Sequence, residues 1–225
     1  MSRSTATKAP PKKSSRTNEA RGPETRRRLL EAASAAFAEH GFRDASLRDI
    51  CKRAGANVAA VNYHFRSKDN LHVEVLRDAF ARIGVERPLR PYPHPPKDPA
   101  EARERLVFVI RQLAEGILET RPSYTRLIML REMYEPSKAL DQVFEEFIQP
   151  RVRAIEDAVA YFLPGASPRA ITHHAISVLG QIVYHRCAAP VALAILGEKA
   201  YSAALVEEII EHVLQFSERA LGAAS

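Results

Sequence analysis

The sequence predicts an all-α protein made of two helical domains. Apolar residues recur at helical spacing along most of the chain, and we find no pair of alternating apolar and polar runs typical of a strand hairpin. Good N-cap residues stand directly before several of these segments, at Ser46, Asn57 and Ser67. Six prolines in the twelve residues 88–99 predict a stiff, extended linker between the two domains.

The composition suits an ordinary globular protein of 225 residues, of which 46% are hydrophobic. The two cysteines, Cys51 and Cys187, have neither the spacing of a zinc site nor that of a disulfide framework. No apolar run approaches the roughly 18 residues of a membrane span, and no apolar segment follows the basic N-terminus. We therefore expect a cytoplasmic protein without a membrane segment.

Positive charge is concentrated at the N-terminus. Residues 1–22 contain six Lys/Arg and one Glu, which gives +5 of the total charge of +6, and almost no large apolar residue. We expect this segment to be a disordered basic arm. Residues 23–87 have twelve Lys/Arg against nine Asp/Glu, and residues 88–225 have fifteen against seventeen. The N-terminal part is therefore the one suited to a polyanion.

Four helices are expected in residues 23–87, the N-terminal domain. The first begins at Pro23, a favourable first-turn residue, and stops at Gly41. The others follow the N-cap residues and cover residues 47–54, 58–65 and 68–85. The C-terminal domain, residues 100–225, should contain helices at residues 99–121, 123–134, 137–163, 168–187 and 202–221, with a short apolar piece after Pro190. Pro150 should kink or break the longest of them.

The short helix over residues 58–65 has an unusual surface. At about 100° per residue, Val58, Val61 and Phe65 fall on one side, which should face the core. On the other side, the Tyr63 ring is flanked by small alanine side chains. This side consists of Ala59, Ala60, Asn62, Tyr63 and His64. Such a face can enter a DNA major groove, where Ala contacts thymine methyls, Asn reads adenine, and Tyr or His bonds to bases or phosphates.

The helices at residues 47–54 and 58–65, joined by a glycine-containing turn, form a helix-turn-helix in which the second helix reads the DNA. Arg48 and Lys68 lie near helix N-termini and are placed for phosphate contacts. The alternatives are an ordinary surface aromatic residue for Tyr63 and a core residue for His64. Cys51 is better explained as a small core residue than as a redox sensor.

These segments resemble the TetR family of transcriptional regulators. The similar stretches are RRRLLEAASAAFAEHGF, SLRDICKRAGANVAAVNYHF and SKDNL, within residues 24–75. The resemblance implies a homodimer whose C-terminal helices form the dimer interface and a small-molecule pocket. It implies DNA contacts from Arg48, Val58, Ala59, Ala60, Asn62, Tyr63, His64 and Lys68. Asn62 departs from the tyrosine usual in the family, and Cys51 from the usual alanine.

Two later stretches, LREMYEPSKAL at residues 130–140 and GQIVYHRCA at residues 180–188, resemble the C-terminal domain of CecR-type TetR regulators, a subgroup linked to drug and efflux responses. Pocket candidates in this domain are Phe108, Tyr124, Met129, Arg131, Glu132, Phe147, His174 and Tyr184, although the aromatic residues are core residues by default. Arg131 and Glu132 could orient a ligand or brace two helices, and the alternative for Arg131 is a solvated pair with Glu135.

Two apolar stripes could build a four-helix dimer interface. They contain Ile171, Ala175, Val178, Leu179 and Ile182 in one helix, and Leu205, Ile209, Val213 and Phe216 in the other. The adjacent His173 and His174 diverge by about 100° around the helix axis, so we expect no shared metal ion.

The sequence predicts a ligand-responsive repressor that binds a palindromic operator in double-stranded DNA as a homodimer and is released by a small apolar or amphipathic inducer. The alternatives are a regulator controlled by a protein partner, an architectural DNA-binding protein with little specificity, and an all-α enzyme with an accessory helix-turn-helix. No Ser/His/Asp grouping, metal-ligand spacing or glycine-rich phosphate loop is visible, so we expect no enzymatic activity and no cofactor.

Overall fold

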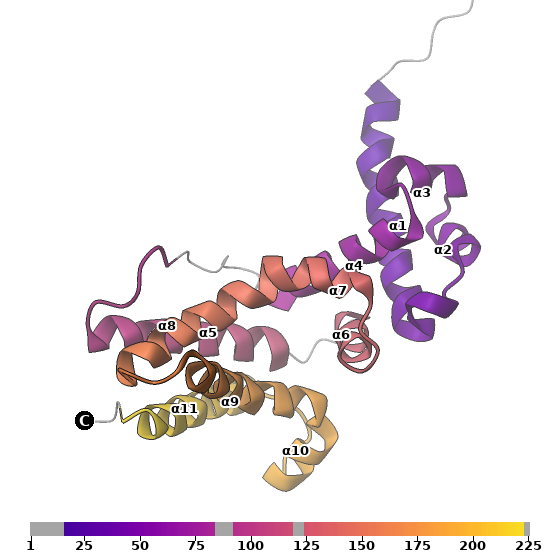
Figure 1. The fold of residues 1–225 in the computed structure, drawn as a ribbon. Helices are drawn as coiled ribbons and strands as arrows, with labels where there is room; N and C mark the ends of the chain where they lie inside the picture. Colours follow the sequence, from indigo (N-terminus) through magenta and orange to yellow (C-terminus); the bar gives the residue numbers. More distant parts are fainter. Residues whose placement is uncertain (1–15, 84–91, 119–123, 223–225) are drawn as a thin grey trace, which may run out of the picture.

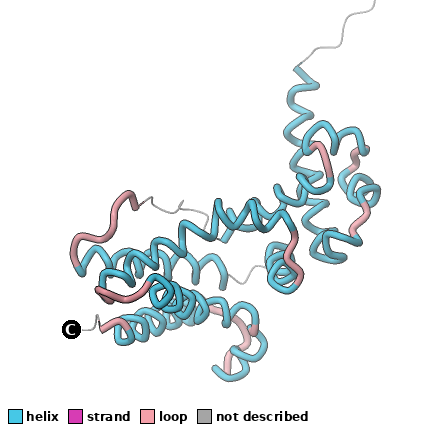
Figure 2. The backbone as a smooth tube through the Cα atoms, in the orientation of Figure 1, coloured by secondary structure: helices cyan, strands magenta, loops and turns pink. Residues whose placement is uncertain are grey.

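The computed structural model describes residues 16–83, 92–118 and 124–222, and within these ranges it contains helices, turns and loops but no β-strand (Figure 1). Figure 2 shows the same arrangement as a tube, with short loops between the helices. The all-α fold expected from the sequence is confirmed. Most of the expected basic arm and the first part of the proline-rich linker lie outside the described residues.

Four helices form the N-terminal head: α1 (Arg16–Asp44), α2 (Leu47–Ala54), α3 (Val58–Phe65) and α4 (Lys68–Ile83). The Asn57 side chain accepts a hydrogen bond from the backbone N–H of Ala60 at 2.9 Å, and the hydroxyls of Ser46 and Ser67 cap α2 and α4 in the same way. These caps follow the sequence prediction because each involves a side chain and a backbone N–H only three residues apart.

The start of α1 differs from the expectation. The helix begins at Arg16 and not at Pro23, so residues 16–22 are helical and are not part of an unstructured arm. Pro23 therefore lies inside the helix, although its ring and its missing N–H favour a position in the first turn. At the other end, Gly41 adopts φ 80° and ψ 166°, which breaks the regular helix as expected.

The C-terminal helices are α5 (Pro99–Leu118), α6 (Tyr124–Tyr134), α7 (Lys138–Val143), α8 (Gln149–Phe162), α9 (Pro168–Cys187), α10 (Ala189–Leu196) and α11 (Ala203–Ala220). A π-helical turn, Phe144–Ile148, separates α7 from α8 directly before Pro150. The wider turn accommodates a ring that would collide with the carbonyl one α-helical turn earlier. Among the described helices none is by itself long and apolar enough to cross a membrane; α9 and α10 would satisfy both criteria together, but they meet at a 90° bend.

Two hydrophobic cores organise the molecule. The C-terminal core is formed by residues of α5, α8, α9 and α11. The head core is formed by α1 to α4 together with Ile128 of α6 and Ala139 and Val143 of α7. In Figure 1, α6 and α7 lie between the head and the C-terminal bundle. The head is therefore completed by two helices that follow the proline-rich linker in the sequence.

The apolar stripes expected at a dimer interface lie mostly inside the C-terminal core. The buried members are Ala175, Val178, Ile182, Leu205, Ile209 and Val213, each at most 6% exposed. Ile171 and Leu179 pack partly against the same core, and Phe216 is 56% exposed. The main apolar side of an amphipathic helix packs on the hydrophobic core of its own domain. These side chains therefore fill the core of their own domain, and a dimer interface formed by the two helices stays a prediction.

Candidate DNA-binding site

Two buried side chains hold the short helix α3 in place. Val61 is 0% and Phe65 is 3% exposed, and both belong to the head core. The guanidinium of Arg26 on α1 lies over the Phe65 ring, 5.1 Å from its centroid. Gly55, which ends α2 in the left-handed conformation at φ 59° and ψ 38°, makes the turn between the two helices. The head thus fixes a helix that would be marginal by itself.

The outer face of α3 is polar and open. Tyr63 is 83% exposed, and its ring touches only the edge of the His64 ring, with centroids 4.9 Å apart. Ala59 and Asn62 are exposed, whereas Ala60 and His64 are half-buried. Val58, expected on the core side, is 40% exposed because it is the first residue of the helix and no earlier turn covers it. Every α3 residue expected to contact DNA is therefore at least partly accessible.

The two expected phosphate ligands differ in their surroundings. Arg48 is exposed on the first turn of α2, and no acidic group in the described part of the chain lies within 4.0 Å of its guanidinium. Lys68 is half-buried: its ammonium donates to the backbone oxygen of Arg43 at 3.2 Å and lies 4.9 Å from the centroid of the Phe42 ring. Arg48 is available for a phosphate without losing a partner, while Lys68 already stabilises the end of α1.

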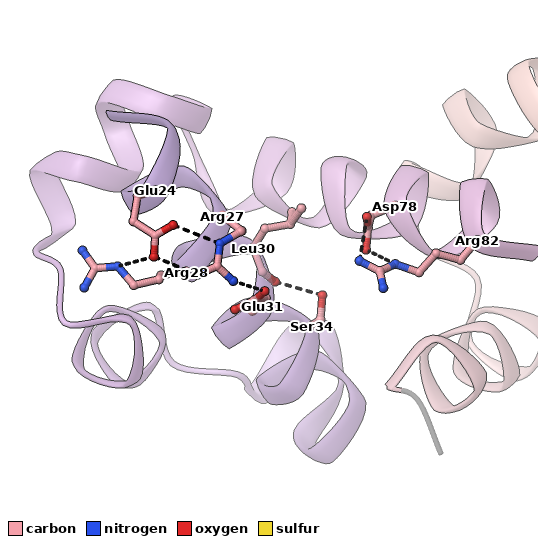
Figure 3. A network of polar contacts seen from close by, with 8 residues as sticks. All are labelled: Glu24, Arg27, Arg28, Leu30, Glu31, Ser34, Asp78 and Arg82. Carbon is pink, nitrogen blue, oxygen red and sulfur yellow. Dashed lines mark hydrogen bonds and ion pairs between the residues drawn. The ribbon is translucent and has the colours of Figure 1, made fainter. Parts of the chain in front are cut away.

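Several arginines of α1 and α4 are paired with acidic side chains of the same helix, as Figure 3 shows. Arg27 lies between Glu24, at 2.7 Å, and Glu31, at 2.6 Å. The hydrogen bond from Arg27 holds the pKa of Glu24 below its ordinary value. On α4, Arg82 contacts Asp78 at 2.8 Å. These paired arginines are weaker candidates for phosphate contacts than an arginine without an acidic neighbour.

Cys51 is 4% exposed inside the head core, and burial raises the pKa of its thiol. A raised pKa keeps the sulfur protonated and unreactive at neutral pH. Its position supports the interpretation as a small core residue.

Arg131 of α6 braces the end of α1. Its Nε donates to the backbone oxygen of Ala38 at 3.1 Å, and its second terminal nitrogen donates to that of Glu39 at 3.0 Å. The first terminal nitrogen lies only 3.2 Å from the point that a Cβ on Gly41 would occupy. Of the roles considered from the sequence, bracing two helices is the one this geometry matches.

The neighbouring Glu132 is 6% exposed and joins three segments. Its Oε2 accepts hydrogen bonds from the backbone N–H and the hydroxyl of Ser137, both at 2.9 Å. Its Oε1 lies 3.3 Å from Nε2 of His72 on α4. We call Arg131, Glu132, Ser137 and His72 the interdomain clamp, because they connect α6 and the start of α7 to α1 and α4.

His72, which the sequence analysis missed, is 2% exposed. Its ring stacks on Phe42 at 4.5 Å and meets the edge of Phe37 at 4.9 Å. Burial lowers the pKa of His72 to about 4, and the charge of Lys68 acts in the same direction. The imidazole is therefore neutral at pH 7, with its Nε2 3.3 Å from Oε1 of Glu132. The signal in the sequence was a histidine among the apolar residues LHVEVL of α4.

The residues considered for a ligand pocket are not gathered in one place. Phe147 packs against the head core, with its ring 6.2 Å from that of Phe80, whereas Phe108 packs against the C-terminal core. Tyr124 and Tyr184 are 47% and 51% exposed, and Met129 is half-buried. His174 bonds through Nδ1 to the backbone oxygen one turn earlier, at 2.8 Å.

The short helix α3 follows α2 after a glycine turn, packs on the head core and has an open polar outer face. This arrangement defines a helix-turn-helix DNA-binding domain. Comparison with known proteins agrees with this class. Residues 29–75 match the family described as bacterial regulatory proteins, tetR family, and residues 102–221 match the C-terminal domain of the HTH-type transcriptional dual regulator CecR. The chain belongs to the TetR family of transcriptional regulators and has a CecR-type C-terminal domain.

Individual relatives give the same assignment. CecR of Shigella flexneri is 26% identical over 173 residues, which are 74% of this chain and 77% of that protein. Two solved structures share the fold. NalD of Pseudomonas aeruginosa, the secondary repressor of the MexAB-OprM multidrug efflux pump, has a TM-score of 0.56 at 21% identity over 88% of this chain and 96% of its own. FadR of Bacillus subtilis, solved with stearoyl-CoA, has a TM-score of 0.55 at 15% identity over 84% and 97%.

Proposed function

We propose that this regulator is a repressor that binds a palindromic operator as a homodimer and is released by a small apolar or amphipathic molecule bound to its C-terminal domain. The observation that carries the proposal is the outer face of α3, where Tyr63 is 83% exposed above two buried anchors. A ring so exposed contributes little to the core, but it can reach base edges or phosphates in a major groove.

The homodimer is proposed to use the outer sides of α9 and α11, in place of the buried stripes. Ile176 and Tyr184 of α9 are 57% and 51% exposed, and Phe216 of α11 is 56% exposed. Gly180 lies between the two α9 residues, and a Cβ there would meet no atom within 4 Å. Glycine in a helix interior costs about 0.5–1 kcal/mol relative to alanine. Close approach of a partner helix gives a physical reason for a glycine at this position.

The inducer class follows from the composition of the C-terminal core. That core consists almost wholly of aliphatic side chains from four helices, and ligand sites in such bundles are predominantly apolar. The names of the two structural neighbours point the same way: one represses a multidrug efflux pump and the other was solved with stearoyl-CoA. Both share only the fold with this chain, so the apolar core carries this part of the proposal.

Tyr63→Ala tests the proposal directly. Duplexes enriched by the wild-type protein from a random-sequence library serve as the operator, and binding to operator and to unselected DNA is measured. The variant should lose about 1–3 kcal/mol of operator binding per half-site while binding unselected DNA nearly as before. Its fold should be unchanged because the side chain is exposed.

Tyr134→Ala is the matched control, since Tyr134 on α6 is 81% exposed and lies outside the helix-turn-helix. It should keep the wild-type preference for operator DNA. If Tyr63→Ala also keeps that preference, α3 is not the recognition helix. If the wild-type protein enriches no sequence at all, the architectural alternative is favoured.

A further inference from the structure

We propose that Arg131 and Glu132 are positioning residues that fix the DNA-binding head on the C-terminal domain and thereby couple the two. The inference rests on the proposed function, because coupling has a role only if an event in the C-terminal domain controls DNA binding. It assigns that role to two adjacent side chains on α6.

The connectivity of the chain places these residues between the head core and the C-terminal core. Ile128, Ala139 and Val143 place α6 and α7 in the head core. The chain then continues from α7 through the π-helical turn into α8, whose Ala154, Ile155 and Ala158 belong to the C-terminal core. A displacement of α8 is therefore passed to α7 and α6. Whether the head follows depends on how firmly those two helices are attached to it.

The bonds of Arg131 fix this attachment at one end of α1. Gly41 breaks the regular helix, so the carbonyls of Ala38 and Glu39 lie in the last turn before the break, where helix carbonyls commonly take donors from outside the helix. Arg131 donates to both, at 3.1 and 3.0 Å. Its positive charge also lies at the negative end of the helix dipole. Apolar contacts tolerate sliding, whereas two directed hydrogen bonds specify one position of α6 along α1.

Glu132 makes the attachment selective for one arrangement. A buried carboxylate is costly unless hydrogen bonds satisfy it. Here the donors are the backbone N–H and the hydroxyl of Ser137, before α7, and the other carboxylate oxygen lies 3.3 Å from Nε2 of His72, on α4. If α4 moves relative to the turn before α7, the buried carboxylate loses its contact with the imidazole. The clamp therefore opposes intermediate positions of the head and favours a discrete change.

The clamp also connects to the DNA-facing side of the head. The His72 ring stacks on Phe42 at 4.5 Å, and the Lys68 ammonium lies 4.9 Å from the centroid of the same ring. Lys68 is the first residue of α4, directly after the turn that follows α3. A shift of His72 therefore disturbs the packing that supports the end of the recognition helix.

Glu132→Gln tests the coupling without knowledge of the inducer. The glutamine keeps the size of the side chain, but it removes the negative charge and has one acceptor oxygen in place of two. Amide hydrogen exchange of α5 and α8 is measured with and without the operator duplex enriched by the wild-type protein. Coupling is reciprocal, so operator should change exchange in these helices of the wild type. In Glu132→Gln this response should be lost, and operator affinity should fall about tenfold.

Glu135→Gln is the matched control, because it removes the same charge from an exposed position directly after the same helix. It should keep both the wild-type affinity and the exchange response. If Glu132→Gln fails to fold, Arg131→Gln, a change at an exposed residue, should show the same loss of response. A residue with a merely structural role would lower the melting temperature and leave the response to DNA intact.

Two results would overturn the inference: an unchanged exchange response in the folded clamp variants, or no operator-induced change in α5 and α8 of the wild type. Failure of the wild type to enrich any duplex would instead refute the proposed function, so the two failures are distinguishable.

Discussion

His72 shows how much of this regulator depends on single side chains between helices. The residue lies in α4, its ring contacts two phenylalanines of α1, and its Nε2 faces Glu132 of α6. These contacts involve two other helices, so the side chain reports the relative position of the three. Because the ring is neutral at pH 7, its contact with the buried carboxylate does not bury a second charge.

The depressed pKa of His72 predicts how stability depends on pH. The folded value is about 4, and the ordinary value for the unfolded chain is 6.5. Above pH 6.5 both states hold a neutral ring, and the stabilisation is complete. As the pH falls from about 6.5 to 4, the unfolded chain binds a proton that the folded chain does not, so the free energy of unfolding decreases by about 3 kcal/mol.

The measurement is chemical unfolding between pH 4 and 7. His72→Gln replaces the ring with a polar side chain that cannot titrate, so it should lose about 3 kcal/mol less than the wild type over this range. His94→Gln, at an exposed histidine in the proline-rich linker, is the control for the removal of a histidine. Parallel curves for His72→Gln and the wild type would contradict the depressed pKa.

At the scale of elements, α9 shows that one helix can present two apolar sides. One side, with Ala175, Val178 and Ile182, is buried in the C-terminal core. The other carries the exposed Ile176 and Tyr184. A single charged substitution on the outer side should therefore disrupt the proposed dimer without disturbing the fold of the chain.

Ile176→Glu should convert a dimer to a monomer while leaving the helix content unchanged. At a two-fold interface the new carboxylate would lie close to the same carboxylate of the partner chain, and the two negative charges would repel each other. Sedimentation velocity at micromolar concentration measures the change. Ile195→Glu on α10 makes the same substitution at a position that is 74% exposed and outside the proposed interface. That variant should remain dimeric. If only Ile195→Glu gives monomers, the dimer interface lies at α10 instead.

At the scale of the whole molecule, charge and structure are unevenly distributed. Residues 1–15 contain Arg3, Lys8, Lys12 and Lys13 and no acidic residue. They precede α1, whose described part begins at Arg16 in the DNA-binding head. A basic segment attached to this head is suited to contact phosphates beside the operator.

Deleting residues 2–15 should leave the helix content of the remaining chain unchanged and weaken its electrostatic binding. Each phosphate neutralised on duplex DNA contributes about −0.9 to the slope of log affinity against log salt, so the slope should become shallower by up to roughly 4 units per protomer. Phosphate contacts carry no direct sequence information, so operator and unselected DNA should lose affinity by similar factors. A larger loss on operator would indicate minor-groove contacts. An identical slope would show that the arm does not bind DNA.

The sequence by itself determined the features that depend on neighbours along the chain. The caps at Ser46 and Asn57 and the break at Gly41 each involve residues within one helical turn, so composition and spacing were sufficient. The open face around Tyr63 followed from helical periodicity in the same way. The early start of α1 and the exposure of Val58 were missed at helix ends, where periodicity is least informative.

Only the tertiary structure decided which partner each surface receives. The sequence showed apolar stripes on α9 and α11, but it could not tell whether such a stripe covers its own core or a second chain, since both bury the same side chains. The sequence did not decide among several roles for Arg131 and Glu132, because their partners, Ala38 and His72, lie far away along the chain. Hydrogen bonds over such separations depend on how whole helices pack, and no local pattern records that packing.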